Sequence, residues 1–220
     1  LSRTPASIRL DAETFADVSF GPRARLGGNA LGASRGLLLE GVRVVEFGVA
    51  AIAPELCGVL SELGADVIKI GMLGDAATIG TVCDALADFA PGVPVVLDPV
   101  MVAKGGHALL AAEAVAILRS RLLPLAAVIT PNLPEAEALT GLAIPDHASA
   151  RAAVKALLDL GAPAVLLKGG HLPGPVVQDL LATADGIVVI ESQRIDTVHT
   201  HGTGCTLASA IATGLAQGMN

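Results

Sequence analysis

The segment with the most chemical information is residues 201–206, which read HGTGCT and lead into an Ala/Leu/Ile-rich run. Two glycines allow a tight turn, and the run that follows predicts a helix beginning near Thr203. Free N–H groups and the helix dipole at such an N-terminus favour a bound anion, such as a phosphoryl group. A thiol at this place, Cys205, is suited to act as a base or a nucleophile. The alternative is an ordinary glycine turn that caps a core helix, with Cys205 buried.

Acidic and amide side chains follow two predicted strands. Asp98 comes directly after residues 93–97 and precedes a proline, a position suited to binding Mg²⁺ or its water shell. Asn132 and Glu135 follow residues 126–129 and are expected to face the same crevice. Both groups have a structural alternative, because Asp98 could cap a turn and the Asn-x-Pro-Glu spacing is typical of a capped helix start.

A lysine and two glycines follow a third predicted strand, residues 164–167. The Lys168 ammonium can reach a polyphosphate, while Gly169 allows a close approach of the backbone. The four clusters together indicate a nucleotide kinase site. The acidic group would bind a metal, the lysine would bind phosphate, the glycine turn would stabilise developing negative charge, and the neighbouring thiol would act as a base.

These clusters need a scaffold that brings the ends of several strands together. Short apolar runs alternate with Ala/Leu-rich runs, which is typical of an α/β fold with a parallel sheet covered on both faces. In such sheets, ligands bind at the carboxyl ends of the strands. We expect strands at 42–47, 67–70, 93–97, 126–129 and 164–167, helices at 54–63, 75–89, 107–121 and 148–160, and a hairpin at 176–181 and 186–190.

Composition excludes several classes of function. The 220 residues are 52% hydrophobic, enough for one sizeable core, and carry a formal charge of −7 with only 14 Lys and Arg. This argues against a nucleic-acid surface. No apolar run reaches the ~18 residues of a membrane span, and three dispersed cysteines without a CxxC pair suit a cytoplasmic protein. The only close histidine pair, His199 and His201, lacks the spacing of a metal site.

The first 38 residues differ from the rest. They contain scattered arginines and glycines without a period of 2 or 3.6, which predicts irregular or disordered chain. A glycine cluster at 27–32 resembles a phosphate loop only superficially, because no strand precedes it and no helix follows. We interpret it as a linker.

Five motifs in order resemble the hydroxymethylpyrimidine/phosphomethylpyrimidine kinases of thiamine biosynthesis, a branch of the ribokinase-like superfamily. The resemblance covers about residues 64–218 and implies a ribokinase-like fold that uses ATP and Mg²⁺. The form GTGC at 202–205 points to the vitamin kinases, because many related sugar kinases carry Asp at the position of Cys205. The matching segments are residues 69–73, 98–106, 129–136, 167–171 and 200–206.

The resemblance also implies roles for individual residues. Cys205 would accept the proton of the substrate hydroxyl, and the amides of Gly202, Thr203 and Gly204 would stabilise the phosphoryl group in transfer. The binding residues would be Asp98 and Glu135 for Mg²⁺, Lys168, Asn132 and Gly169 for ATP, and Met72 and Val100 for the pyrimidine. For Met72 and Val100, simple core packing is the alternative.

The N-terminal part departs from the kinase pattern. These kinases begin with a GSDSGGG-type loop that binds the pyrimidine, and residues 1–63 contain no match to it. Residues 39–48 and 54–70 instead resemble the start of family III CoA-transferases, so we infer a chimera. The expected division is an irregular segment at 1–38, a CoA-transferase-like βαβ segment at 39–70 that merges into the sheet, and a kinase domain at 71–220.

The function that the resemblance implies is ATP-dependent phosphorylation of hydroxymethylpyrimidine and its monophosphate. Two alternatives stay open: a catalytically silent nucleotide-binding fragment, and a related vitamin kinase of the pyridoxal type. The expected partner is a small pyrimidine alcohol or its phosphate, with a homodimer open and neither nucleic acid nor membrane involved.

Overall fold

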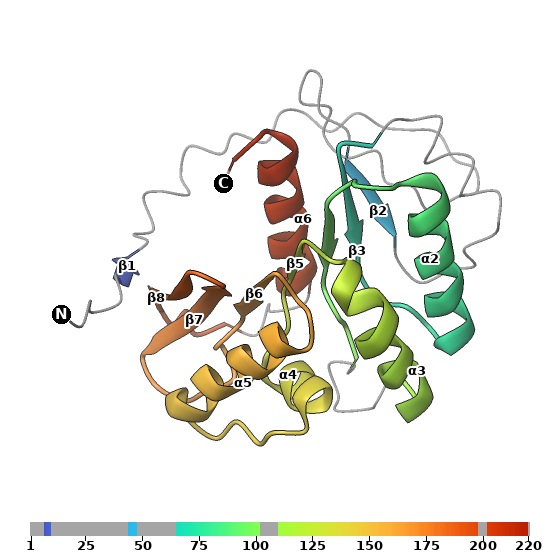
Figure 1. Ribbon diagram of the computed structural model, residues 1–220. Helices are drawn as coiled ribbons and strands as arrows, with labels where there is room; N and C mark the ends of the chain where they lie inside the picture. Colours follow the sequence, from blue (N-terminus) through green and yellow to red (C-terminus); the bar gives the residue numbers. More distant parts are fainter. Residues whose placement is uncertain (1–6, 10–43, 48–64, 102–109, 198–201, 220) are drawn as a thin grey trace.

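A single mixed sheet organises the chain. The computed structural model describes residues 7–9, 44–47, 65–101, 110–197 and 202–219, and its eight strands lie in the order β1-β8-β7-β6-β5-β4-β3-β2 (Figure 1). Strands β2 to β6 run parallel, whereas β7 is antiparallel to both β6 and β8. The strands are β1 (Ser7–Arg9), β2 (Val44–Phe47), β3 (Val67–Ile70), β4 (Val95–Leu97), β5 (Val128–Ile129), β6 (Ala164–Leu167), β7 (Val176–Thr183) and β8 (Gly186–Gln193).

Helices cover both faces of the sheet. On one face, α2, α3, α4 and α5 contribute to a large apolar core together with alternate strand residues such as Ile68 and Leu97. On the other face, Val67, Val96 and Val128 pack against Ala208 and Ala212 of α6. The helices are α2 (Ala76–Phe89), α3 (Ala112–Ile117), α4 (Leu133–Thr140), α5 (His147–Asp159) and α6 (Thr203–Ala216). The α/β class with a mostly parallel, two-sided sheet is confirmed.

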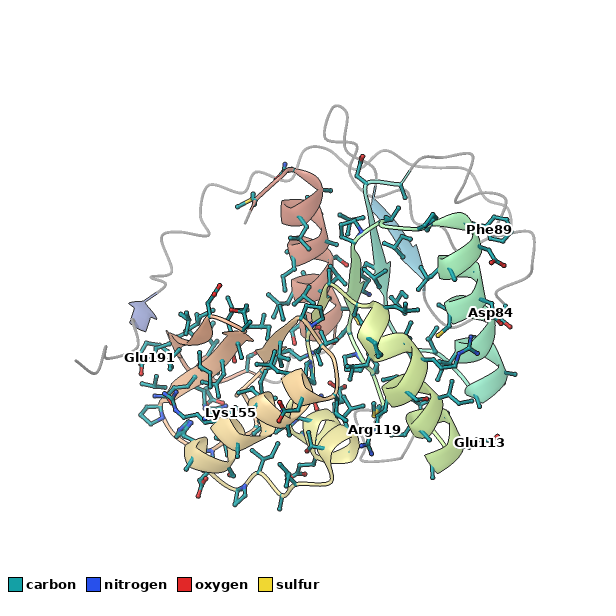
Figure 2. The ribbon with its side chains drawn as sticks, viewed as in Figure 1. Asp84, Phe89, Glu113, Arg119, Lys155 and Glu191 are labelled. Carbon is teal, nitrogen blue, oxygen red and sulfur yellow. The ribbon has the colours of Figure 1, made fainter. Side chains whose placement is uncertain are left out.

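Charged side chains lie on the outer surfaces of these layers. Asp84 of α2, Glu113 of α3 and Lys155 of α5 are exposed, and Asp84 and Glu113 lie at the outer margin of the molecule (Figure 2). This separation of charged and apolar faces is what positions each helix on the sheet. No helix in the part of the chain that the structure describes is long and apolar enough to cross a membrane.

The strands expected from apolar runs are present. Residues 67–70 and 164–167 form β3 and β6 with the expected bounds, whereas β4 and β5 begin two residues later than expected. The hairpin extends beyond its expected ends, to Thr183 and Gln193.

The helix expected at 107–121 is wrong in its bounds. Among the described residues it begins at Ala112, and from Leu118 it widens into a π-helical turn that ends at Leu122. A short 3₁₀ turn with Pro124 follows. Leu118 and Leu122 are both fully buried, and the ring of Pro124 cannot continue the helical hydrogen bonding. Core packing and the proline therefore reshape the end of this helix.

The N-terminal segments join both edges of the sheet. Val44–Phe47 forms β2 and pairs in parallel with β3, as expected for this strand. Ser7–Arg9 forms β1 and pairs in parallel with β8, so these three residues are a strand where irregular chain was expected. The glycine cluster at 27–32, the expected helix at 54–63 and the rest of the first 43 residues lie outside the described residues. The division at 38 and 70 stays a prediction.

The turn between β6 and β7 depends on a glycine at one position. A Cβ atom on Gly169 would lie 1.8 Å from the carbonyl oxygen of Gln178, which belongs to β7. The backbones of the two segments are therefore in contact at this point. Gly170, the next residue, has no atom within 4 Å of the corresponding position.

We predict that Gly169→Ala lowers the free energy of unfolding by about 3 kcal/mol, because the added methyl group must displace backbone rather than a flexible side chain. Urea unfolding of the full chain measures this effect. Gly170→Ala is the matched control and should change stability by less than about 0.5 kcal/mol. Equal stability of the two variants would contradict the close approach of Gly169 to β7.

Candidate active site

The candidate site lies where β4, β5 and β6 end. Because these strands are parallel, the residues that follow them reach the same edge of the sheet. The pairing of β5 with β6 extends past the strands, since the Lys168 amide donates to the Pro131 carbonyl at 2.9 Å and Asn132 bridges to Lys168. Three of the polar clusters expected from the sequence are thus brought together.

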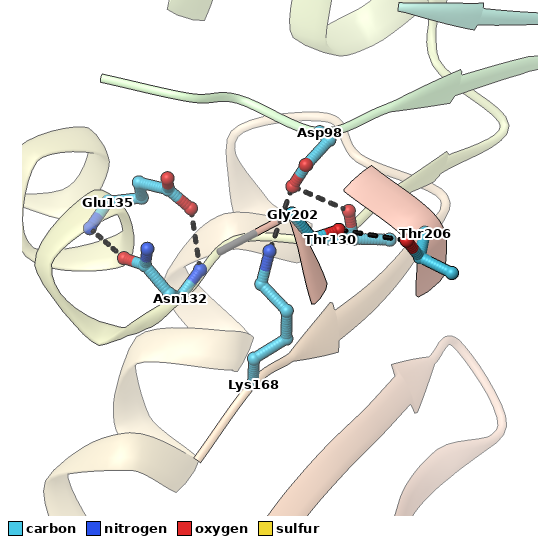
Figure 3. Close-up of polar contacts among 7 residues, drawn as sticks. All are labelled: Asp98, Thr130, Asn132, Glu135, Lys168, Gly202 and Thr206. Atoms are coloured by element: carbon cyan, nitrogen blue, oxygen red, sulfur yellow. Dashed lines mark hydrogen bonds and ion pairs between the residues drawn. The ribbon is translucent and has the colours of Figure 1, made fainter. Parts of the chain in front are cut away.

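An ion pair forms the centre of the site. The Lys168 ammonium donates to Oδ1 of Asp98 at 2.8 Å, and the Thr130 hydroxyl donates to the same oxygen at 3.1 Å (Figure 3). Asp98 is 1% exposed, whereas the side chain of Lys168 retains 17% of its exposure. The carboxylate is therefore buried with its partners, and the lysine side chain stays partly exposed to solvent. Thr130 lies within the motif at residues 129–136. A threonine at this position gave no reason to predict a role in the site, so this residue was missed at the level of the sequence.

The N-terminus of α6 lies directly over this pair. A Cβ atom on Gly204 would lie 3.0 Å from Nζ of Lys168 and 3.7 Å from Oδ2 of Asp98. The N-cap residue, Gly202, has a φ of 79°, a left-handed conformation that glycine adopts most easily. The Gly202 carbonyl accepts from both the amide and the hydroxyl of Thr206, each at 2.9 Å. The glycine turn and the helix start expected from HGTGCT are confirmed.

Glu135 is held at the start of α4. Its carboxylate accepts from the Asn132 amide at 2.7 Å, and the Glu135 amide donates to Oδ1 of Asn132 at 2.9 Å (Figure 3). This reciprocal pair is the capping box that the sequence left open as an alternative. The Met101 amide also favours the charged carboxylate and lowers the pKa of Glu135, so this side chain lies near the segments after both β4 and β5. Its role as a metal ligand stays a prediction.

Burial governs the protonation of Glu135. Loss of water raises its pKa to about 7, opposed by the amide of Asn132 and the charge of Lys168, and supported by the charge of Asp98. The carboxyl is 2% exposed. A pKa near 7 means that Glu135 changes its protonation state close to neutral pH.

Two further titratable groups, His171 in the loop after β6 and Asp179 on β7, lie near Lys168. The Gly169 amide donates to Oδ1 of Asp179 at 2.7 Å, and burial raises the pKa of Asp179 against the effects of that amide and of Lys168. Burial, with a further contribution from the Lys168 charge, lowers the pKa of His171. Asp179 lies ten residues from Gly169 on a separate strand, so no local sequence pattern predicted this contact.

The other expected site residues have these positions. Cys205 is exposed in the first turn of α6, so the buried-cysteine alternative is wrong. Thr203, the first residue of α6, is also exposed. Met72 and Val100 are half-buried and follow β3 and β4, respectively, so both reach the same sheet edge as Asp98. No group of three or more His, Cys, Asp or Glu side chains with metal-binding geometry occurs among the described residues.

The sheet, the ion pair and the overlying helix start define a small-molecule kinase of the ribokinase-like class. Residues 40–220 match the model of the phosphomethylpyrimidine kinase family. The chain belongs to this family. The match includes residues 40–70, and the CoA-transferase origin of residues 39–70 stays a prediction.

Characterised relatives agree with this assignment. The chain is 42% identical over 216 residues to a hydroxymethylpyrimidine/phosphomethylpyrimidine kinase of Rhizobium meliloti. The aligned region covers 97% of this chain and 79% of that protein. It is 53% identical over 154 residues to the kinase of the same name from Haemophilus influenzae, covering 68% of this chain and 57% of the relative. The chain thus spans less than two thirds of the second relative's length.

Solved structures share the fold. A phosphomethylpyrimidine kinase from Clostridium difficile is 35% identical, with a TM-score of 0.67 over 80% of this chain and 73% of that chain. A Bacillus subtilis pyridoxal kinase, solved as an ADP complex, is 36% identical, with a TM-score of 0.70 over 79% of this chain and 67% of that chain.

We predict that Glu135 makes the protein less stable as the pH rises from about 4.5 to 7. Folding raises the pKa of Glu135, so the folded state binds the proton more tightly than the unfolded state does. This stabilisation is lost as the pH rises to the pKa of the folded state. The free energy of unfolding falls by about 3 kcal/mol at most through this effect. Glu135→Gln should remove this part of the pH dependence in urea unfolding measured in metal-free buffer.

Glu137→Gln is the control for this experiment. Glu137 lies on the same helix and accepts from the Ile144 amide at 2.7 Å. The control should retain the wild-type slope between pH 5 and 7. An unchanged slope in the Glu135 variant would show that this carboxyl does not bind a proton on folding.

Proposed function

We propose that the chain catalyses ATP-dependent phosphorylation of hydroxymethylpyrimidine and of its monophosphate. The observation that supports this most directly is the position of Gly204 above the Asp98–Lys168 pair, with a Cβ position 3.0 Å from the lysine Nζ. A backbone rich in N–H groups, a reachable ammonium and a buried carboxylate then surround one small volume. Phosphoryl transfer needs this combination, because it depends on positioning and on stabilisation of negative charge.

Lys168 and the α6 N-terminus would bind the phosphates of ATP. The ammonium would turn from Asp98 to a phosphate oxygen, and the amides of Gly202, Thr203 and Gly204 would donate to the group in transfer. The absence of a side chain at Gly204 allows the backbone at the start of α6 to approach Lys168 closely. Asn132 and Gly169 flank Lys168 in the structure, and we assign them to the nucleotide side of the site.

Cys205 would act as the general base. Its thiolate would accept the proton of the substrate hydroxyl while that oxygen forms a bond to the γ-phosphorus and the bond from phosphorus to the ADP oxygen breaks. The side chain is exposed in the first turn of α6, where a negative charge is favoured by the helix dipole.

Asp98 and Glu135 are the residues that would hold Mg²⁺. Magnesium in nucleotide sites needs only one or two carboxylates, with water and phosphate oxygens completing its shell, so the lack of a larger acidic cluster among the described residues fits this metal. When bound, the ion neutralises charge on the phosphates. Asp98 is held by Thr130 and Lys168, and Glu135 by the Asn132 amide, so both carboxylates have defined orientations.

The pyrimidine would bind beside Met72 and Val100. Both side chains are half-buried at the sheet edge that carries Asp98, which suits contact with a flat, partly apolar ring. A pyridoxal-type alcohol is the second candidate substrate, because the Bacillus subtilis pyridoxal kinase shares this fold at 36% identity. A cytoplasmic location and a homodimer complete the proposal.

We predict that Cys205→Ala lowers kcat for phosphorylation of hydroxymethylpyrimidine by about 10²–10⁴-fold, the usual contribution of a general base. A coupled assay of ADP release measures the rate. The Kd for ATP–Mg²⁺, measured by calorimetry, should change little because the binding amides remain. An unchanged kcat would overturn the role of Cys205.

Cys83→Ala is the control for the loss of a thiol. Cys83 is buried in the core at α2, and the variant should retain kcat even if it is less stable.

The same assay with pyridoxal separates the two candidate substrates. Binding of ATP–Mg²⁺ without turnover of either alcohol would instead support the catalytically silent alternative.

A further inference from the structure

Arg194 clamps the loop that follows Lys168. Its Nε donates to the Gly174 carbonyl at 2.6 Å, one terminal nitrogen donates to the Gly170 carbonyl at 2.9 Å, and the other donates to the Leu172 carbonyl. One guanidinium thus satisfies three alternate carbonyls of a five-residue loop. The guanidinium spreads its donors over three nitrogen atoms in one plane, whereas the three donors of a lysine ammonium share a single nitrogen and cannot span the same carbonyls.

The same loop is fixed at two other points. At its start, the Gly169 amide donates to Asp179 of β7, and in its middle the side chain of Leu172 is buried in the main core. The Arg194 amide also donates to the Pro175 carbonyl at 2.8 Å, which extends the pairing of β7 and β8 by one step. Every one of these contacts joins the loop to the hairpin or the core, so the hairpin determines where the loop lies.

Arg194 lies at the same end of the sheet as Lys168. It follows the last residue of β8, Gln193, and precedes the N-cap of α6, Gly202, by eight residues in the sequence. Since β8 is antiparallel to β7 and β7 to β6, Arg194 lies at the sheet edge where Lys168 emerges. One side chain therefore holds the lysine loop to the end of β8.

We propose that Arg194 is a positioning residue for ATP. This inference rests on the proposed kinase function and extends it to a residue outside the motifs that contact the phosphates. By holding the carbonyls of Gly170, Leu172 and Gly174, Arg194 keeps the Lys168–Gly169 backbone in its binding conformation before ATP arrives. Without it, the loop has more conformations in the free protein, and ATP binding must order them.

The test uses the full chain with Arg194→Ala and Arg194→Lys. Calorimetry measures the Kd for ATP–Mg²⁺, and steady-state kinetics measure KM for ATP and for hydroxymethylpyrimidine separately. We expect Arg194→Ala to raise the Kd and the KM for ATP about tenfold, with the KM for the pyrimidine changed by less than about twofold. Arg194→Lys should give an intermediate Kd and KM for ATP, because one ammonium can replace only some of the hydrogen bonds that Arg194 makes to the loop.

A matched control and a rescue separate positioning from general stability. Arg121→Ala removes another exposed guanidinium, which pairs with Asp84 of α2, and should leave both KM values unchanged. Guanidinium ion at tens of millimolar should restore part of the ATP affinity in Arg194→Ala and have no such effect on Arg121→Ala.

The outcomes distinguish the two proposals. An ATP affinity in Arg194→Ala within about twofold of the parent, or an equal rise of both KM values with a lower Tm and no rescue, overturns the positioning role alone. Failure of the parent chain to bind ATP–Mg²⁺ overturns the proposed function, and the role of Arg194 with it.

Discussion

The ion pair of Asp98 and Lys168 is the interaction on which the site depends. An ionised carboxylate that is 1% exposed is stable in a protein only with charged or hydrogen-bonded partners. Here the partners are Thr130, which follows the adjacent strand β5, and Lys168, which follows β6, the next strand in the sheet. To satisfy one buried carboxylate, β4, β5 and β6 must lie side by side in that order. The same requirement assembles the candidate site.

This pair also suits a site that must exchange its partners. Lys168 keeps 17% of its side-chain exposure, and its ammonium sits on a flexible stem, so it can move from one anionic oxygen to another with little change in its surroundings. In the proposed reaction, Lys168 would pair with a phosphate oxygen in place of Asp98, and Asp98 would be one of the residues that hold Mg²⁺. Lys168 would then keep an anionic partner throughout, which limits the energetic penalty of the exchange.

Local sequence patterns predicted much of the scaffold. β3 and β6 were expected with the correct bounds because both faces of a central parallel strand are buried, which leaves an uninterrupted apolar run. The capping box of Asn132 and Glu135 follows from a spacing of three residues. The π-helical turn at Leu118–Leu122 was not predicted, because it depends on how buried leucines meet the core rather than on helix propensity. The contacts of Asp179 and Arg194 join residues 10 to 24 positions apart, beyond the reach of any periodic pattern.

The antiparallel hairpin has a larger part in the site than its place in the sheet suggests. Its ladder pairs Gln178 with Glu191 and Asp179 with Ile190, and alternate residues face opposite sides. A slip of one residue would carry Asp179 to the other face and remove its contact with the Gly169 amide. It would also shift Arg194 away from the carbonyls that it holds. The position of Lys168 beside Asp98 is therefore determined on one side by the parallel strands and on the other by the register of β7 and β8.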